Sequence, residues 1–115
     1  MDVSTTPTLI QEESDSISWD EAGDYVGKLI TVCGPVIAGY FAKSSSGQPT
    51  FLNLGKDYPD STRFVVLIWG SDRARFPSIP EQYYLEKTIC VRGIVSVFQG
   101  LVEMEIKDPD QITIK

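Results

Sequence analysis

The chain has 115 residues, of which 42% are hydrophobic, so it has room for one hydrophobic core and is too apolar to be disordered. The formal net charge of −6 disfavours a nucleic-acid partner, and no apolar run approaches the roughly 20 residues needed to span a bilayer. Histidine is absent, which removes the commonest general base and the commonest metal ligand.

The N-terminal segment carries most of the acidity. Residues 1–24 hold seven Asp or Glu and no Lys or Arg, which leaves nine acids and ten bases in the rest of the chain. Residues 1–16 show no periodicity and are interpreted as a flexible acidic arm, followed by one domain over 17–115. No signal peptide pattern is visible, so we expect a cytoplasmic protein if the sequence is complete.

A short helix is predicted at the start of the domain. Ser18-Trp19-Asp20-Glu21 fits a capping box, with Ser18 as N-cap and Glu21 three residues later. The helix is expected to run from about Trp19 to Val26 and to end at Gly27, because glycine is the usual C-terminal stop.

Two similar strands follow far apart in the chain. Residues 28–36 alternate with period two and place Ile30, Val32 and Val36 on one face. These residues fit the sequence pattern K-x-I-x-V-x-G-x-V, and the same pattern recurs over 87–95. An inward glycine in each strand allows the bend that a small barrel needs.

Two further strands are predicted between them. Residues 50–54 are bounded by glycines, and 64–69 form a nearly continuous run of β-formers. The loop over 55–62 joins these two strands as a hairpin. Trp69, at the end of the second strand, is expected in the core.

The second half of the chain begins with a helical connection over 71–76 and 78–84. A last long strand over 101–107 places Val102, Met104 and Ile106 inward and Glu103 and Glu105 outward. A final extended piece covers 112–114. The resulting order of elements predicts an all-β fold: a five-stranded OB-fold Greek-key barrel with an N-terminal helix and a helical connection between strands three and four.

The chain from about Ile17 to Ile114 resembles bacterial OB-fold nucleic-acid-binding domains of the tRNA-anticodon-binding-like group. The matching segments are Trp19–Ala22, Gly27-Lys28, Val32–Val36, Thr50–Gly55, Val66–Trp69 and Asp108–Ile112. In anticodon-binding members, a Phe at the place of Phe51 stacks on a base. Those members usually have a basic or acidic pair after the next Leu, where Gly55-Lys56-Asp57 stands here, so only the Phe is carried over.

The candidate site lies on the second and third strands, because OB domains bind ligands on that face and on the loops beside it. Leu52 and Leu54 are expected inward, which turns Phe51 and Asn53 outward. Glu103 and Glu105 lie close enough to this face to repel phosphates. The predicted nucleic-acid-binding residues are Phe51, Asn53, Lys43, Lys56, Arg63, Arg73, Phe98 and Gln99.

The leading function is binding of single-stranded DNA or RNA with weak sequence preference. Nucleobases would stack on Phe51 and Phe98, and the basic side chains of the predicted site would lie near phosphates. In the competing interpretation these aromatics are partly buried barrel residues and the basic side chains are ordinary surface. The alternative function is a protein- or small-ligand-binding accessory module within a larger protein. No enzyme activity, cofactor, metal site or membrane partner is predicted.

The two cysteines lie on neighbouring strands of such a barrel. Cys33 and Cys90 both take outward positions, and a disulfide requires the strand register to place them opposite each other. Two unpaired thiols are the expectation.

Overall fold

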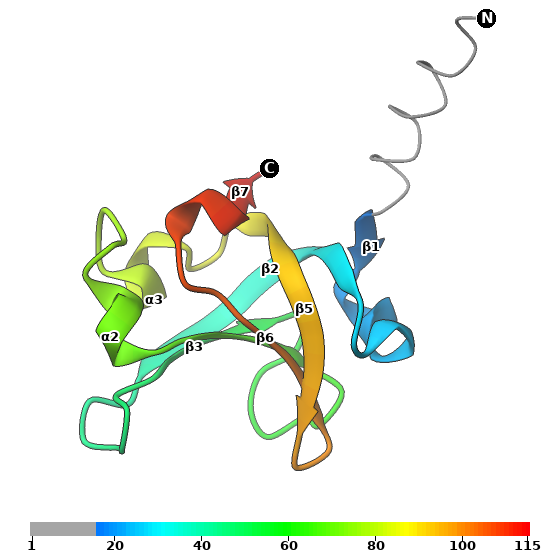
Figure 1. Cartoon of the computed structure of the whole chain (residues 1–115), viewed down its shortest axis with the longest axis horizontal. Coiled ribbons are helices and arrows are strands. Elements are labelled where there is room, and N and C mark those ends of the chain that lie inside the picture. Colours follow the sequence, from blue (N-terminus) through cyan, green and yellow to red (C-terminus); the bar gives the residue numbers. More distant parts are fainter. Residues whose placement is uncertain (1–15) are drawn as a thin grey trace, which may run out of the picture.

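The computed structural model describes residues 16–115 (Figure 1), so the predicted arm over 1–16 lies outside the described part except for Ser16. Within these residues no helix has the length and apolar character to cross a membrane. The elements, in chain order, are β1 (Ser16–Ser18), η2 (Trp19–Tyr25), β2 (Leu29–Phe41), β3 (Thr50–Leu54), β4 (Phe64–Ile68), α2 (Gly70–Arg73), α3 (Pro80–Tyr83), β5 (Thr88–Phe98), β6 (Leu101–Glu105), η3 (Pro109–Gln111) and β7 (Ile112–Ile114).

Five of the strands pair in a ring. The order is β2, β3, β4, β6 and β5, and a further pairing joins β5 back to β2. The β4–β6 pair is parallel and the other four pairs of the ring are antiparallel. β1 adds to β2 in parallel and β7 adds to β5 in antiparallel orientation, outside the ring. The predicted β-rich fold with few, short helices is confirmed.

β2 is longer than the sequence pattern predicts, because it runs from Leu29 to Phe41 instead of ending at Val36. Its first half pairs with β5 and its second half pairs with β3, and the register shifts between Val36 and Ala38. Such an irregularity bends a strand and lets it serve two sides of a curved sheet. The period-two pattern stops at the bend, which is why the sequence places the end of the strand too early.

The core fills the inside of the ring. Its fully buried side chains alternate along the strands, as the period-two patterns predict. They are Val32, Val36, Leu52, Leu54, Phe64, Val66, Ile68, Ile89, Val91, Met104 and Ile106, among others. Burial of each such side chain contributes about 1.5–3 kcal/mol.

The predicted first helix is a 3-10 helix, η2, whose start is capped as expected. The Glu21 carboxylate accepts a hydrogen bond of 2.9 Å from the backbone N–H of Ser18. Trp19 lies directly over Gly34 and Gly55: a Cβ on Gly55 would come within 2.1 Å of its ring. Gly55 also has a φ of +82°, so both space and backbone conformation require glycine there.

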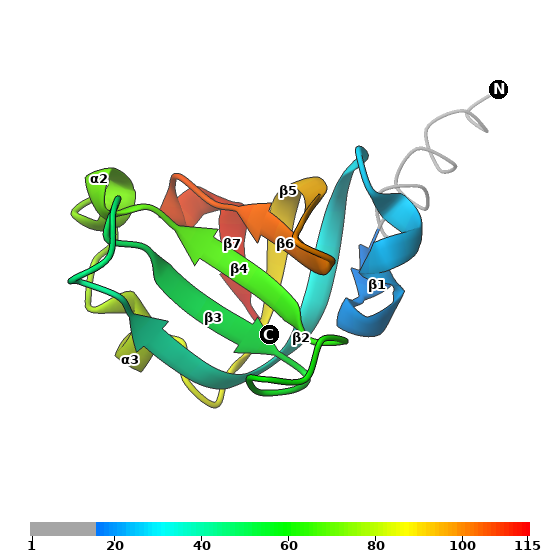
Figure 2. The same cartoon turned by 90° about the horizontal axis from the view of Figure 1, so that it is seen from below.

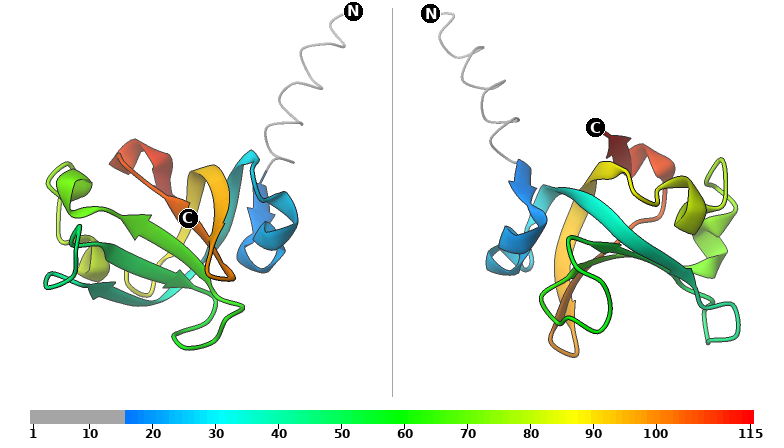
Figure 3. Two further views of the ribbon diagram at one scale, coloured as in Figure 1. Left: turned by 60° about the horizontal axis from the view of Figure 1, so that its bottom comes forward. Right: turned by 180° about the vertical axis from the view of Figure 1, so that it is seen from behind.

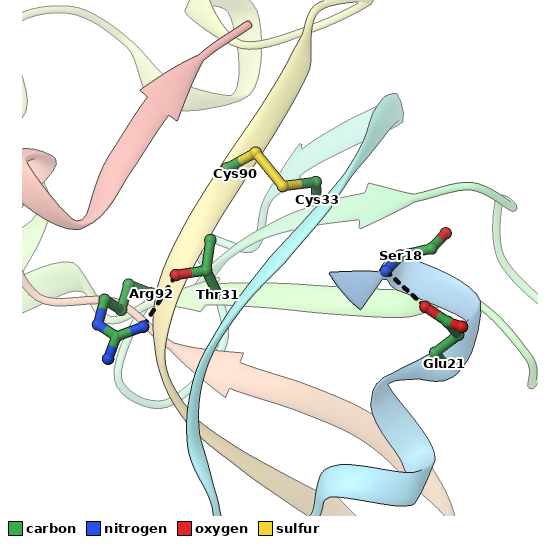
Figure 4. Close-up of a disulfide and its surroundings, with 6 residues drawn as sticks. All are labelled: Ser18, Glu21, Thr31, Cys33, Cys90 and Arg92. Atoms are coloured by element: carbon green, nitrogen blue, oxygen red, sulfur yellow. Dashed lines mark hydrogen bonds between the residues drawn. A yellow bond between two sulfur atoms is a disulfide. The ribbon is translucent and has the colours of Figure 1, made fainter. Parts of the chain in front are cut away.

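A disulfide joins β2 to β5 (Figure 4), so the expectation of two free thiols is wrong. Cys33 and Cys90 stand directly opposite each other in the register of the two strands. On the same outer face, Arg92 donates a hydrogen bond of 3.0 Å to the Thr31 hydroxyl (Figure 4). Local sequence gives the face of a strand on which a residue lies but not its partner across the sheet.

Candidate nucleic-acid interface

The outer face of β3 carries the two central candidate residues. Leu52 and Leu54 are fully buried inside the ring, so Phe51 and Asn53 point to the opposite side, as predicted. Figure 2 shows this part of the sheet, with β3 and β4 side by side and β2 and β6 flanking them.

Two rows of side chains cross this face from strand to strand. The register gives one row as Tyr40, Phe51, Leu67 and Glu105, and the next row as Ala38, Asn53, Val65, Glu103 and Ser96. The first row places two aromatic residues, Tyr40 and Phe51, directly opposite each other on β2 and β3.

A cavity of about 510 Å³ opens beside these rows. Aromatic walls come from Phe51, Tyr40 and Tyr58, and Val65 and Leu101 add aliphatic surface. Three polar residues also line it: Asn53 from β3, and Asp57 and Arg63 from the loop between β3 and β4. An apolar cavity with a few polar groups is the usual form of a ligand site.

The polar residues of the cavity are already partly connected. The side-chain amide nitrogen of Asn53 donates to Oδ1 of Asp57 at 3.3 Å, and the backbone N–H of Tyr58 donates to the same oxygen at 2.7 Å. Arg63 donates from Nη1 to the backbone carbonyl of Asp60 at 2.8 Å and lies over the Tyr58 ring, 5.2 Å from its centre. Its Nε is buried and has no acceptor within residues 16–115.

The loop that presents Tyr58 and Arg63 is held by Asp60. Its carboxylate accepts hydrogen bonds from the hydroxyl and the backbone N–H of Thr62, at 2.5 and 2.8 Å. These two bonds hold the pKa of Asp60 below its ordinary value, and the nearby charge of Lys56 acts in the same direction. The loop therefore has its own internal order.

Phe98 and Gln99 lie at the tip of the β5–β6 hairpin. Gln99 and Gly100 both have positive φ, 54° and 80°, as a two-residue turn requires. Phe98 is 61% exposed and is paired with Leu101, which lines the cavity. In both views of Figure 3 this tip and the loop between β3 and β4 lie at the same end of the molecule.

The two candidate lysines are exposed at opposite ends of β3. Lys56 follows β3 in the loop that carries Asp57, and Lys43 lies in the loop between β2 and β3, where its carbonyl accepts from Gln48 at 3.1 Å. Neither forms an ion pair within the described residues.

Arg73 is held away from the cavity by its own contacts. It forms a forked ion pair with Glu81, at 2.8 and 3.1 Å, and donates to the buried Thr50 hydroxyl at 2.6 Å. Its guanidinium lies 3.6 Å from the centre of the Phe41 ring. Burial, the largest single influence, raises the pKa of Glu81, but the hydrogen bonds and charge of Arg73, together with a backbone hydrogen bond, leave the pKa below its ordinary value.

Glu103 lies on the outer face, as predicted, but it is buried, with only 9% of its surface exposed. Its neighbours across the sheet are Val65 and Ser96. Burial, followed by the charge of Glu105, raises the pKa of Glu103. The alternation on β6 gives the correct face but not the depth, because burial depends on the strands on both sides.

Several residues at this surface were not among the candidates. Tyr40 is missed because β2 is predicted to end before it, and Tyr58 and Asp57 because their loop has no periodic pattern. Trp69 is partly exposed and lies against Gly47, so the expectation that it belongs to the core is wrong.

Comparison with known proteins adds a likeness of fold. No family model and no curated protein matches the sequence. Among solved structures, aspartyl-tRNA synthetase from Entamoeba histolytica matches with a TM-score of 0.57 and 17% identity over 86% of this chain and 21% of that chain. A chain described as an aspartyl-tRNA synthetase from Leishmania major Friedlin matches with a TM-score of 0.52 and 16% identity over 86% of this chain and 20% of that chain. The chain thus spans about a fifth of these synthetases and shares the fold of that part.

Proposed function

We propose that the protein is an OB-type module that binds single-stranded nucleic acid, RNA in the first place, on the outer face of β2, β3 and β4. The observation that carries the proposal is the cavity lined by Phe51, Tyr40 and Tyr58. The ring order of the five strands matches the OB barrel, in which this face and its flanking loops bind oligonucleotides. The matched synthetases act on a tRNA by name, which favours RNA over DNA.

Aromatic stacking supplies the contact. Phe51 and Tyr40 stand opposite each other on β3 and β2, while Tyr58 and Phe98 are 73% and 61% exposed at the end of the sheet. Stacking on aromatic side chains is worth about 1–3 kcal/mol per base and is tolerant of sequence. These side chains can receive successive bases of one strand.

Charge makes the expected binding weak and dependent on salt. Lys56 and Arg63 lie on the loop beside the cavity, whereas Glu103 and Glu105 lie on the neighbouring strand. Arg73 is omitted from the proposed site because Glu81 already holds it. With few phosphate contacts we expect affinities in the micromolar range and a shallow but measurable loss with salt.

The alternative is an accessory module that binds a protein or a small apolar ligand. The specific observation in its favour is the two carboxylates of Glu103 and Glu105 on the same face as the exposed Tyr40, Tyr58 and Phe98. An apolar partner is indifferent to salt, whereas phosphate contacts weaken with it. Neither function involves a catalytic step.

The test is fluorescence anisotropy of labelled oligo-rU and oligo-dT, titrated with protein at low and moderate salt. We expect Phe51→Ala to weaken binding about 5- to 100-fold, since it removes one stacking platform. Tyr83→Ala is the matched control, because Tyr83 is an aromatic residue 40% exposed on α3 that does not line the cavity. Absence of binding at low salt, or equal losses in the two variants, would refute the proposal.

A further inference from the structure

The polar residues that line the cavity have an arrangement that stacking does not require. Three polar residues, Asn53, Asp57 and Arg63, line a space of about 510 Å³ whose other walls are apolar. A cavity of this size holds a nucleobase with part of its sugar. The hydrogen-bonding groups left over in this cluster indicate which base suits it.

Two acceptors are left over. Asn53 is only 8% exposed, and its amide nitrogen faces Oδ1 of Asp57. Because a carboxylate only accepts, this contact fixes the amide nitrogen toward Asp57 and leaves the amide oxygen for another donor. Oδ1 of Asp57 accepts both bonds of the cluster, and its second oxygen accepts none within residues 16–115.

Donors are left over on Arg63. Arg63 has five N–H groups, of which the described residues use one, to the carbonyl of Asp60. Its Nε is the one buried side-chain nitrogen or oxygen atom without a partner in the part of the chain that the structure describes. The cation stays beside the cavity because Tyr58 lies under the guanidinium.

We infer that this cavity selects guanine, an inference that rests on the proposed function. The Watson–Crick edge of guanine presents two adjacent donors, N2–H and N1–H, followed by one acceptor, O6. Those donors suit Asp57 and the Asn53 oxygen, and O6 suits Arg63. Uracil instead has carbonyl oxygens on both sides of a single donor. At least one of these oxygens would face the Asp57 carboxylate, and two acceptors that face each other repel. Cytosine and adenine present one donor group next to acceptors.

The nucleic-acid strand is therefore bound with base specificity at one nucleotide and by stacking at the others. Phe51 holds a base by its face, whatever its identity, while the neighbouring cluster holds the edge of the base in the cavity. Binding thus has a preference at one nucleotide within an otherwise tolerant interface.

The experiment compares three labelled RNAs by anisotropy: an oligouridine, the same strand with one central guanosine, and the same strand with one central inosine, which lacks the N2 amine. We expect the guanosine strand to bind about tenfold tighter than oligouridine, with the inosine strand between them. Asp57→Asn replaces an acceptor by a donor and should bring the three affinities together.

Asp60→Asn is the matched control. It removes the same charge from the same loop, and Asp60 does not line the cavity. Both bonds from Thr62 go to Oδ1 of Asp60, so an asparagine oxygen can still accept them and hold the loop, and the preference for guanosine should persist. Equal affinities for all three RNAs, with Phe51→Ala still weakening them, would refute the guanine site and leave the proposed function intact. A preference that survives Asp57→Asn would also refute it. Absence of binding by every RNA would refute both.

Discussion

The disulfide between β2 and β5 allows the most direct energetic test. It joins Cys33 to Cys90, 57 residues apart, and closes the seam where the ring returns to its first strand. In the chain-entropy model, a loop of that length lowers the entropy of the unfolded chain by about 14 cal/mol/K, which is about 4 kcal/mol at 25 °C. The double variant Cys33→Ser, Cys90→Ser should lose stability of that order.

The assay is urea denaturation of both proteins, followed by the fluorescence of Trp19 and Trp69. The variant should unfold at lower urea and with a larger m-value, because its unfolded state exposes more surface without the cross-link. In thermal unfolding, about 4 kcal/mol corresponds to a drop in Tm on the order of 15 °C or more for a domain of this size. Reduction of the unmodified protein should shift its transition in the same direction.

Alkylation provides the control. The unreduced protein should take up no iodoacetamide, and the reduced, unfolded protein should take up two adducts, one for each cysteine. Two adducts without reductant would show that the pair is not bonded, and a stability change below about 1 kcal/mol would show that the cross-link does not constrain the unfolded chain.

Two further predictions concern buried charge. Arg73→Ala should lower the free energy of unfolding, measured by urea denaturation, by about 1–3 kcal/mol, because it leaves Glu81 and the Thr50 hydroxyl without their partner. Arg73→Lys should not restore the stability, because an ammonium cannot form the forked pair. An effect on oligonucleotide binding without loss of stability would contradict this role. The raised pKa of Glu103 means that the folded state holds its proton more tightly than the unfolded state, so stability is greatest below the ordinary carboxyl pKa and falls as pH rises through the raised value. Glu103→Gln should therefore be more stable than the unmodified protein at pH 7, and coincident stability profiles between pH 4 and 8 would rule this out.

The local features of this protein follow from short stretches of its sequence. Period-two alternation gave the strand of residues 50–54 and turned Phe51 and Asn53 away from the core, because adjacent side chains of a strand point to opposite faces. The Ser18–Glu21 cap set the start of the first helical turn, because capping involves residues only three apart.

Contacts between residues that are distant in the chain could not be predicted in this way. The register between β2 and β5 placed Cys33 opposite Cys90, and the bend after Val36 carried Tyr40 to the side of Phe51. Arg73 forms an ion pair with Glu81 instead of lying at the predicted site, and Glu103 is buried between the strands on both sides of it. Register and burial depend on packing between segments that are distant in the chain, and the periodicity of one strand gives the face of each side chain but not its neighbour.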